Sequence, residues 1–322
     1  MSNRKQTLVP RWVDGYIRRL DDLPRATSKI TDASWAGALG DGRRIGDWTA
    51  YFTGQLAEHP WREVLATWWP RLLPGIAAGA THGVIRAGHV VRTLLADEEQ
   101  AQHAEDQATL DELAHALAFW AARSRAVPPA ADPAGRLDPL AALDAVPRIA
   151  SQQGNLAARF GQLTEESGWP ASVGRLRPAG TPGQVPARLA GLVDAATLRY
   201  LSHGHGQPVL LVHTATAPNA VLAALPALPD SMWAPSLSAV WAASAAIFAA
   251  YAPAEGVAPG PPPTLPAGPD AVTEMLGRAV DHGDEHVIKF TDTAAEAYTR
   301  TGQVEALAAA QRVATLIPSS KG

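Results

Sequence analysis

Residues 110–123, LDELAHALAFWAAR, decide the fold class of this chain. Their apolar residues recur every three or four positions, as in Leu110, Leu113 and Leu117, and this spacing places them on one face of an α-helix. The same period recurs at 47–56, 61–69, 76–95, 270–280 and 294–316. Strand signals, which would be alternating apolar and β-branched residues, are nearly missing. The sequence therefore predicts a mainly α fold.

The 322 residues are predicted to form a single multi-helix domain spanning 1–322. Proline and glycine gather in three connections, at about 124–140, 170–186 and 252–269, which we expect to be long loops. A division into two lobes near residue 130 stays open, because the composition does not shift there. Residues 208–214, PVLLVHT, suit either a buried strand or a buried helix, and we predict a helix.

The composition describes a globular chain with 47% apolar and 18% charged residues, enough to build a core. There are 27 lysines and arginines against 31 acidic residues, so no basic excess exists to bind nucleic acid. Cysteine is absent, which excludes disulfides, thiolate metal sites and a cysteine nucleophile. Any metal must therefore be held by imidazole, carboxylate or a less usual ligand.

Two stretches without charge, 207–229 and 231–254, have the length of membrane spans. Both are rich in alanine and interrupted by proline, so we interpret them as buried helices and expect no membrane partner. The chain opens with the polar sequence MSNRKQ and has no apolar segment behind its basic residues. We therefore expect a cytoplasmic protein, whose oligomeric state stays open.

Histidines in apolar surroundings are the first candidate functional residues. In 81–89, THGVIRAGH, a helix places His82, Arg86 and His89 on one face. Buried imidazole and guanidinium groups need polar partners. From spacing alone, a hydrogen-bonded core histidine is the simpler interpretation. The same holds for His213, which lies within the first charge-free stretch and needs only one carbonyl partner.

A second histidine segment, 281–290, DHGDEHVIKF, carries the clearest spacing. On an unbroken helix, His282, His286 and Lys289 share one face, and histidines four residues apart can bind one metal ion. Gly283 can also break the helix and remove His282 from that face. An ammonium group repels a cation, so either Lys289 pairs with a neighbouring carboxylate, or its neutral amine adds carbon dioxide. The resulting carbamate is anionic and binds a metal as a carboxylate does.

Several other enzyme classes lack their usual sequence support. No Walker-type phosphate loop is present, and no G-x-G-x-x-G follows a predicted strand. The G-x-S-x-G of serine hydrolases and the H-E-x-x-H of metalloproteases are missing as well.

Several dispersed segments together resemble the questin oxidase-like family of fungal and bacterial proteins. Five segments match, and they occur along the chain in the expected order. They are WWPRLLPG at 68–75, HGVIR at 82–86, LAHALAFW at 113–120, HTATAP at 213–218 and GDEHVIKF at 283–290. The resemblance covers roughly residues 30 to 317. It implies a mostly helical fold and oxidative opening of an anthraquinone-type ring. A characterised relative resembles a non-haem iron dioxygenase with four histidine ligands and a carboxylated lysine.

The resemblance implies metal ligation by His82, His213, His286 and a Lys289 that carries a carbamate derived from carbon dioxide. Many members also have a histidine in a helix near the N-terminus, ahead of an Ala-Leu pair. This chain has TDASWAGAL at 31–39, without a histidine. The remaining ligand is therefore missing or is replaced by one of three residues, which are Asp32, His89 and His282.

The resemblance predicts an Fe(II)-dependent oxidoreductase of secondary metabolism. Another divalent transition metal is the alternative to Fe(II). Dioxygen would be the co-substrate, and a small aromatic polyketide or quinone would be cleaved at a C–C bond, by dioxygenase or Baeyer–Villiger-type chemistry. Arg86 would be catalytic and stabilise an anionic oxygen. Trp120 and Trp241 would stack on the substrate, and the 252–269 loop would cover it.

Two alternatives from other functional classes stay open. One is a zinc-type hydrolase or lactone-forming enzyme that uses the same residues. The other is a non-catalytic helical protein that binds an aromatic metabolite.

Overall fold

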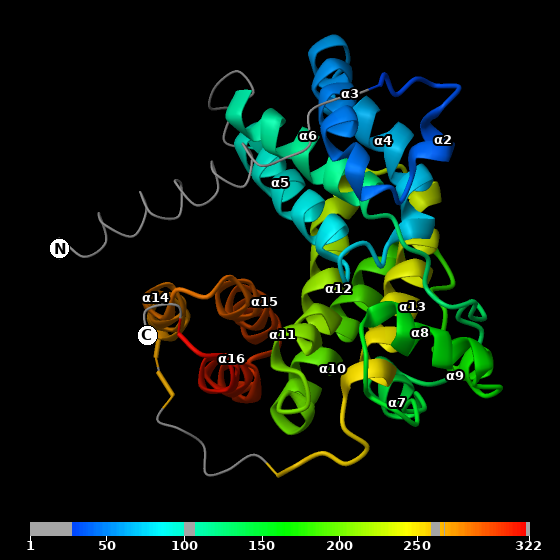
Figure 1. Cartoon of the computed structure of the whole chain (residues 1–322). Helices are drawn as coiled ribbons and strands as arrows, with labels where there is room; N and C mark the ends of the chain where they lie inside the picture. The colour runs from blue at the N-terminus through cyan, green and yellow to red at the C-terminus, as the bar shows by residue number, and fades with distance from the viewer. Residues whose placement is uncertain (1–27, 100–106, 259–264, 267, 320–322) are drawn as a thin grey trace.

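The computed structural model describes residues 28–99, 107–258, 265–266 and 268–319 of the chain. In this part the regular structure is helical, and two isolated β-bridges join Ile76 to Arg125 and Leu137 to Leu176 (Figure 1). The predicted mainly α, single-domain fold is confirmed. The N-terminal segment MSNRKQ, on which the expected localisation depends, lies outside the described residues.

The helices follow one another closely along the chain. Those of the first half are α2 (Trp35–Ala38), η1 (Gly42–Arg44), α3 (Ile45–Glu58), α4 (Trp61–Leu72), η2 (Leu73–Gly75), α5 (His82–Glu99), α6 (Gln107–Ala122), α7 (Pro139–Asp144) and α8 (Leu156–Glu165). Those of the second half are α9 (Trp169–Gly174), η3 (Pro182–Gln184), α10 (Val185–His203), α11 (Pro208–Leu211), α12 (His213–Ala224), η4 (Leu225–Ala227), η5 (Asp230–Met232), α13 (Trp233–Tyr251), α14 (Ala271–His282), α15 (Glu285–Thr301) and α16 (Val304–Leu316).

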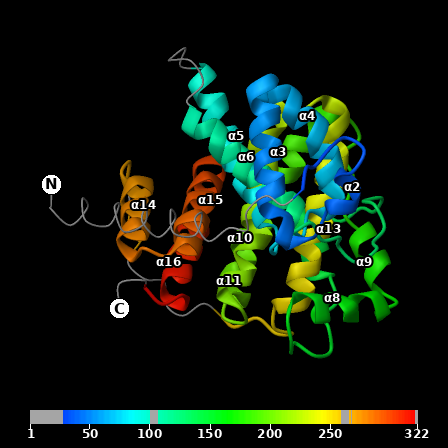
Figure 2. The ribbon, with the colours of Figure 1, turned by 45° about the horizontal axis from the view of Figure 1, so that its top comes forward.

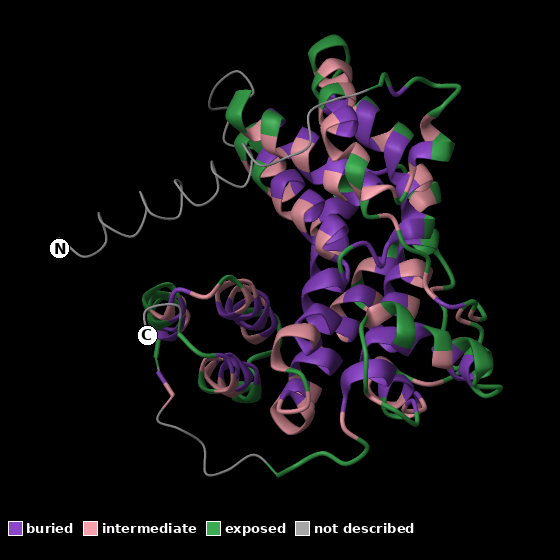
Figure 3. Cartoon of the chain, viewed as in Figure 1, coloured by how far each residue is buried: buried purple, intermediate pink, exposed green. Residues whose placement is uncertain are grey.

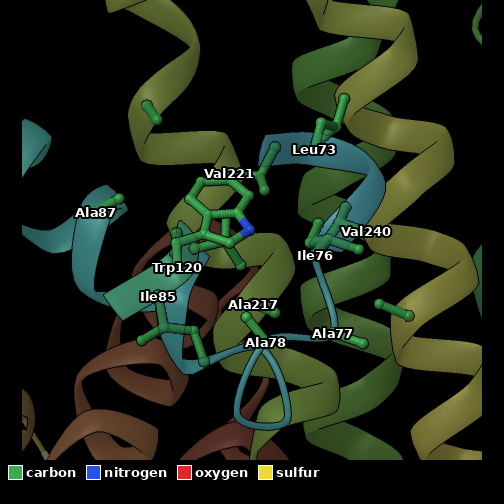
Figure 4. Packing of buried hydrophobic residues seen from close by; sticks show 14 of the residues in the cluster. Leu73, Ile76, Ala77, Ala78, Ile85, Ala87, Trp120, Ala217, Val221 and Val240 are labelled. Atoms are coloured by element: carbon green, nitrogen blue, oxygen red, sulfur yellow. The ribbon is translucent and has the colours of Figure 1, made fainter. Parts of the chain in front are cut away.

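One main hydrophobic core runs through the molecule and includes residues from both sides of position 130. Helices α12 and α13 lie in its middle, where Figure 3 shows most of their residues buried. Trp120 of α6 is fully buried among apolar side chains that include Ile85, Ala217 and Val221 (Figure 4). Its indole N–H donates a hydrogen bond to the carbonyl of Gly75 at 3.3 Å. Packing in this core therefore holds α5, α6 and α12 together.

The two charge-free stretches belong to this core. Residues Pro208–Ala227 and Asp230–Tyr251 are long and apolar enough to cross a membrane, with mean hydropathies of 1.4 and 1.3. However, 72% and 61% of these windows are buried against the rest of the fold. The predicted helix at 208–214 is present as α11 and the start of α12.

Helices α14, α15 and α16 form a three-helix group at the C-terminal end, beside α10 (Figures 1 and 2). The sequence pattern predicted one helix over 294–316, but the structure divides it. Gly302 has a φ of 70°, in the left-handed region, and ends α15 before α16 begins at Val304. Glycine adopts this conformation without the steric cost of a Cβ atom, so it commonly ends helices.

The predicted loops are partly correct. Residues 124–138 form a connection between α6 and α7. Between 170 and 186, however, the chain contains most of α9, η3 and the first two residues of α10. The first part of the 252–269 connection reaches the end of α10, where Val257 N–H donates to the carbonyl of Ser202 at 2.9 Å. Residues 259–264 and 267 of this predicted cover lie outside the described residues.

Gly88 permits the close crossing of α5 and α12. A Cβ atom added at Gly88 would lie 2.5 Å from the carbonyl oxygen of Ala220 and 2.7 Å from its Cβ. We expect Gly88→Ala to lower the free energy of unfolding by about 1–3 kcal/mol, because the backbones must separate. Chemical denaturation would measure this loss.

The matched control is Gly54→Ala in α3, where an added Cβ meets nothing within 4 Å. Alanine is favoured over glycine inside a helix, so this variant should gain about 1 kcal/mol. Equal effects of the two substitutions would contradict the proposed close crossing.

Candidate metal centre

Three histidines from three helices meet at one point. His82 is the first residue of α5, His213 is the first residue of α12, and His286 is the second residue of α15. One ring nitrogen from each lies within 4.8 Å of those of the other two. The ring centroids are 4.5 Å apart for His82 and His213, and 5.8 and 5.7 Å from these to His286. Residues separated by up to 204 positions thus form one cluster.

Backbone carbonyls set the tautomers of two of these histidines. His82 Nδ1 lies 2.5 Å from the carbonyl oxygen of Gly79, and His213 Nδ1 lies 3.2 Å from that of Leu210. A carbonyl oxygen only accepts hydrogen bonds, so each Nδ1 carries the proton and each Nε2 presents a lone pair. In metal sites, such a partner on the second ring nitrogen is the usual arrangement.

The two lone pairs point into the same space. His82 Nε2 and His213 Nε2 are 3.2 Å apart. Because both rings carry their proton on Nδ1, no hydrogen atom lies between the two Nε2 atoms. Their lone pairs repel each other unless a positively charged group binds both. Two nitrogens bound to one ion at about 2.1 Å lie about 3.0–3.4 Å apart in octahedral or tetrahedral geometry. The observed spacing therefore suits two ligands of one metal ion.

Lys289, one turn after His286, reaches the same space. Its Nζ lies 2.9 Å from His213 Nε2 and 3.2 Å from His82 Nε2. Burial lowers the pKa of Lys289 to about 8. As an ammonium, Lys289 donates to both imidazoles and satisfies the cluster without a metal. As a neutral amine it is a nucleophile, which is the form that carbon dioxide carboxylates.

The imidazoles favour their neutral, ligating form. Burial, followed by the charge of Lys289, lowers the pKa of His82 to about 4. The same causes in the same order hold the pKa of His213 well below its usual value and lower that of His286. His213 is completely buried, whereas His82 and His286 are partly exposed. The cluster is therefore approached from the side of His82 and His286.

A strained turn places His82. Gly79, Ala80 and Thr81 have φ angles of 54°, 56° and 75°, all in the left-handed region. A residue with a Cβ atom loses about 1–2 kcal/mol in this conformation. The segment 76–81 was predicted to be helical, but the bridge from Ile76 to Arg125 and this turn delay the start of α5 to His82. The turn brings the Gly79 carbonyl to His82 Nδ1.

The start of α15 places His286. Gly283 has a φ of 86° and ends α14, and Asp284 then caps α15. The Asp284 carboxylate accepts hydrogen bonds from the backbone N–H groups of His286 and Val287, at 2.8 and 3.3 Å. His286 Nδ1 is buried, lies 3.4 Å from the Asp284 carboxylate and makes no hydrogen bond to it. The break at Gly283 lets the chain turn into α15 with its second residue facing His82 and His213.

The structure places each of the three candidates for the remaining ligand away from the cluster. Of the two alternatives for 281–290, an unbroken helix and a break at Gly283, the structure has the break, and His282 Nε2 bonds the carbonyl of Ile317 at 3.0 Å. Asp32 is exposed and accepts from the Tyr51 hydroxyl at 3.2 Å. His89 lies two turns along α5 and contacts Arg92. None of the three joins the cluster in the described part of the chain.

The residues that were predicted to contact the substrate have other partners in the structure. Arg86 is paired with Glu112 of α6, at 2.7 Å. Trp120 and Trp241 are fully buried and have no exposed face for a substrate, so the prediction that they stack on one is wrong. The Trp241 indole N–H donates to the carbonyl of Val173 at 2.9 Å. Both side chains belong to the core because their large apolar rings fill the space between helices.

Sequence reasoning missed the residues that orient the ligands. The carbonyls of Gly79 and Leu210 have no side-chain signal, and only the folded backbone brings them to the imidazoles. It also missed the polar contacts along the same helices: Arg92 of α5 pairs with Asp292 at 2.9 Å and with Glu296 at 2.5 Å, and Asn219 donates to Glu296 at 2.9 Å. These contacts join α5, α12 and α15 beyond the cluster.

A scan against protein-family models gives no match for this sequence, and a search of curated proteins gives no significant match. The resemblance to the questin oxidase-like family therefore stays a prediction.

Proposed function

We propose that the chain is a metal-dependent oxygenase in which His82, His213 and His286 hold a divalent transition metal. The single observation that supports this most is the 3.2 Å approach of the His82 and His213 Nε2 lone pairs, each fixed by a carbonyl partner. Neutral imidazoles are the most common metal ligands in proteins. The choice of Fe(II) rests on the family resemblance, and so do dioxygen as co-substrate and the aromatic polyketide or quinone substrate.

The ligand set fits a metal best if Lys289 is carboxylated. An ammonium at 2.9 and 3.2 Å from the two Nε2 atoms would occupy the space of the ion. A carbamate supplies oxygen ligands and a negative charge instead. Helices α5, α12 and α15 all begin at this point. Helix N-termini carry partial positive charge and favour an anion, so the position of Lys289 suits a carbamate better than an ammonium.

The residues of the chain would then prepare the centre in three ways. The Gly79 and Leu210 carbonyls hold the protons of His82 and His213 on Nδ1, so that both Nε2 atoms stay available. The buried side of the cluster, around His213, excludes water. A substrate would reach the centre from its partly exposed side, at His82 and His286. When bound, the metal would activate dioxygen and lower the pKa of a substrate hydroxyl.

A zinc-type hydrolase is the second candidate function, because three imidazoles and an open position are also the ligand set of catalytic zinc. The two candidates differ in their need for dioxygen. Oxygen uptake in an electrode with a hydroxyanthraquinone, dependent on added Fe(II), supports the oxygenase. Hydrolysis of a lactone or ester at an unchanged oxygen level supports the zinc enzyme.

The test of the centre itself is metal analysis by mass spectrometry on freshly purified full chain. We expect close to one equivalent of a transition metal, restored by Fe(II) after removal by a chelator. The same analysis on His82→Leu provides the comparison. A wild-type content below about a tenth of an equivalent, without gain on addition of Fe(II) or Zn²⁺, would contradict the proposal.

A further inference from the structure

A recess lies between α5 and α6, further along α5 than the cluster. It is a hollow of about 380 Å³ lined by Arg86, His89, Val90, Thr93, Ala108, Thr109 and Glu112. None of these side chains belongs to the histidine cluster. Its size lies near the lower end of the range for small-molecule sites. Five of its seven lining residues are polar or charged, and Val90 and Ala108 are apolar.

His89 presents a hydrogen-bond donor to this hollow. Arg92 Nη2 lies 3.4 Å from His89 Nδ1, and because a guanidinium only donates, Nδ1 accepts and the proton lies on Nε2. Within the described residues, His89 Nε2 has no hydrogen-bond partner and is not among the buried unpaired atoms. Burial and the charge of Arg92 lower the pKa of His89, so the ring is neutral at pH 7. The free N–H is therefore available to a ligand.

Arg86 adds a charged donor to the same hollow. Its Nε and Nη2 donate to one carboxylate oxygen of Glu112, at 3.3 and 2.7 Å. This arrangement leaves Nη1 without a partner among the described side chains. The Arg86 side chain is 30% exposed. Arg86 and His89 together present N–H groups, which suit an oxygen that carries negative charge.

The hollow is placed to receive one end of a molecule whose other end lies at the cluster. Arg86 and His89 follow His82 by four and seven residues on the same face of α5. A helix rises 1.5 Å per residue, so they lie about 6 and 10.5 Å further along the axis. This face is continuous with the partly exposed side of the cluster at His82.

We infer that this hollow is a recognition site for a small organic acid, whose carboxylate or phenolate oxygen is bound by Arg86 Nη1 and His89 Nε2. Val90 and Ala108 contact the apolar part of the ligand. In the proposed oxygenase, on which this role depends, the hollow anchors the acidic end of the substrate while the opposite end faces the centre. Arg86 thus selects the substrate at a distance from the metal.

The probe is salicylate, a fluorescent aromatic acid small enough for the hollow, titrated into the full chain after metal removal with a chelator. We expect saturable binding to the wild type. Arg86→Met and His89→Leu should each raise the dissociation constant about tenfold or more, because each removes a donor to an anion. His89→Gln keeps an N–H near the Nε2 position and should bind within about threefold of the wild type.

Arg62→Met is the matched control, because Arg62 also pairs with a glutamate, Glu98, but lies outside the hollow. It should leave salicylate binding unchanged, and thermal unfolding identifies any variant that has lost its fold. The inference is overturned if salicylate does not bind, or if Arg86→Met and Arg62→Met behave alike. Since no metal is present, these outcomes are independent of the metal analysis. A chain that binds metal but not salicylate refutes the hollow alone, and one that binds salicylate but no metal refutes the oxygenase alone.

Discussion

Replacing His213 with leucine is expected to lower the affinity for Fe(II) and Zn²⁺ at least about 100-fold. Loss of a partner that only orients a ligand typically costs 10- to 100-fold in metal affinity, and loss of a ligand should cost more. His213 is fully buried, and its Nε2 is near both His82 Nε2 and Lys289 Nζ. Leucine suits this apolar environment, so the helices should stay in place. Competition with a chromophoric zinc chelator measures the change.

His282→Leu is the control for this experiment. His282 also lies next to the predicted ligand segment, but its Nε2 bonds the carbonyl of Ile317 instead of the cluster. We expect an affinity within about twofold of the wild type. If His213→Leu keeps its metal, or if His282→Leu loses it equally, then the three-histidine centre is wrong.

Replacing Lys289 with methionine is expected to remove carbon dioxide from the chain and, because a ligand is lost, to lower metal affinity at least about 100-fold, as for His213. Methionine retains the apolar length of the side chain and cannot be carboxylated. Carbon-13 bicarbonate added to the wild type should give one carbamate resonance in the NMR spectrum, absent from Lys289→Met. Lys29→Met is the control, because Lys29 is an exposed lysine outside the cluster, and the resonance should remain.

The pH dependence of this carbamate follows from the environment of the amine. Burial lowers the pKa of Lys289 to about 8, and only the neutral amine reacts with carbon dioxide. At fixed carbon dioxide, carbamate formation should therefore increase with pH between about 7 and 9, whereas an exposed lysine would need a pH above about 10. A resonance that persists in Lys289→Met, or metal binding that does not respond to removal of bicarbonate, would contradict carboxylation of this residue.

The ends of the helices show how far local sequence patterns extend. The apolar period correctly predicted the helix at 47–56, which lies within α3, and the helix at 110–123, which lies in α6 except for its last residue, Arg123. It extended the helix at 76–95 too far toward the N-terminus, because the period continues through a segment that pairs with Arg125 and turns left-handed at Ala80 and Thr81. It also joined α15 and α16 across Gly302, since apolar residues keep their period on both sides of the break.

The candidate ligands were named from segments that resemble a known family, and the fold brings His82, His213, His286 and Lys289 together. Spacing alone favoured ordinary core histidines at His82 and His213, because one imidazole in an apolar helix needs only one carbonyl partner. Each does have such a partner, on Nδ1. The spacing of residues along the sequence does not show where the Nε2 atom of each ring points. That direction depends on how α5, α12 and α15 pack against one another.

The amino-acid order alone was enough to specify a mainly α, cysteine-free chain with several histidines in apolar segments, since these properties depend on near neighbours and on composition. Which imidazoles share one space was decided by tertiary packing, because His82, His213 and Lys289 are 131 and 76 positions apart and meet only where α5, α12 and α15 begin. The same packing excluded His282, although it is close in sequence. Gly283, in the left-handed region with a φ of 86°, ends the helix after His282. The glycine made this break possible in the sequence, but only the folded backbone decided between a break and an unbroken helix.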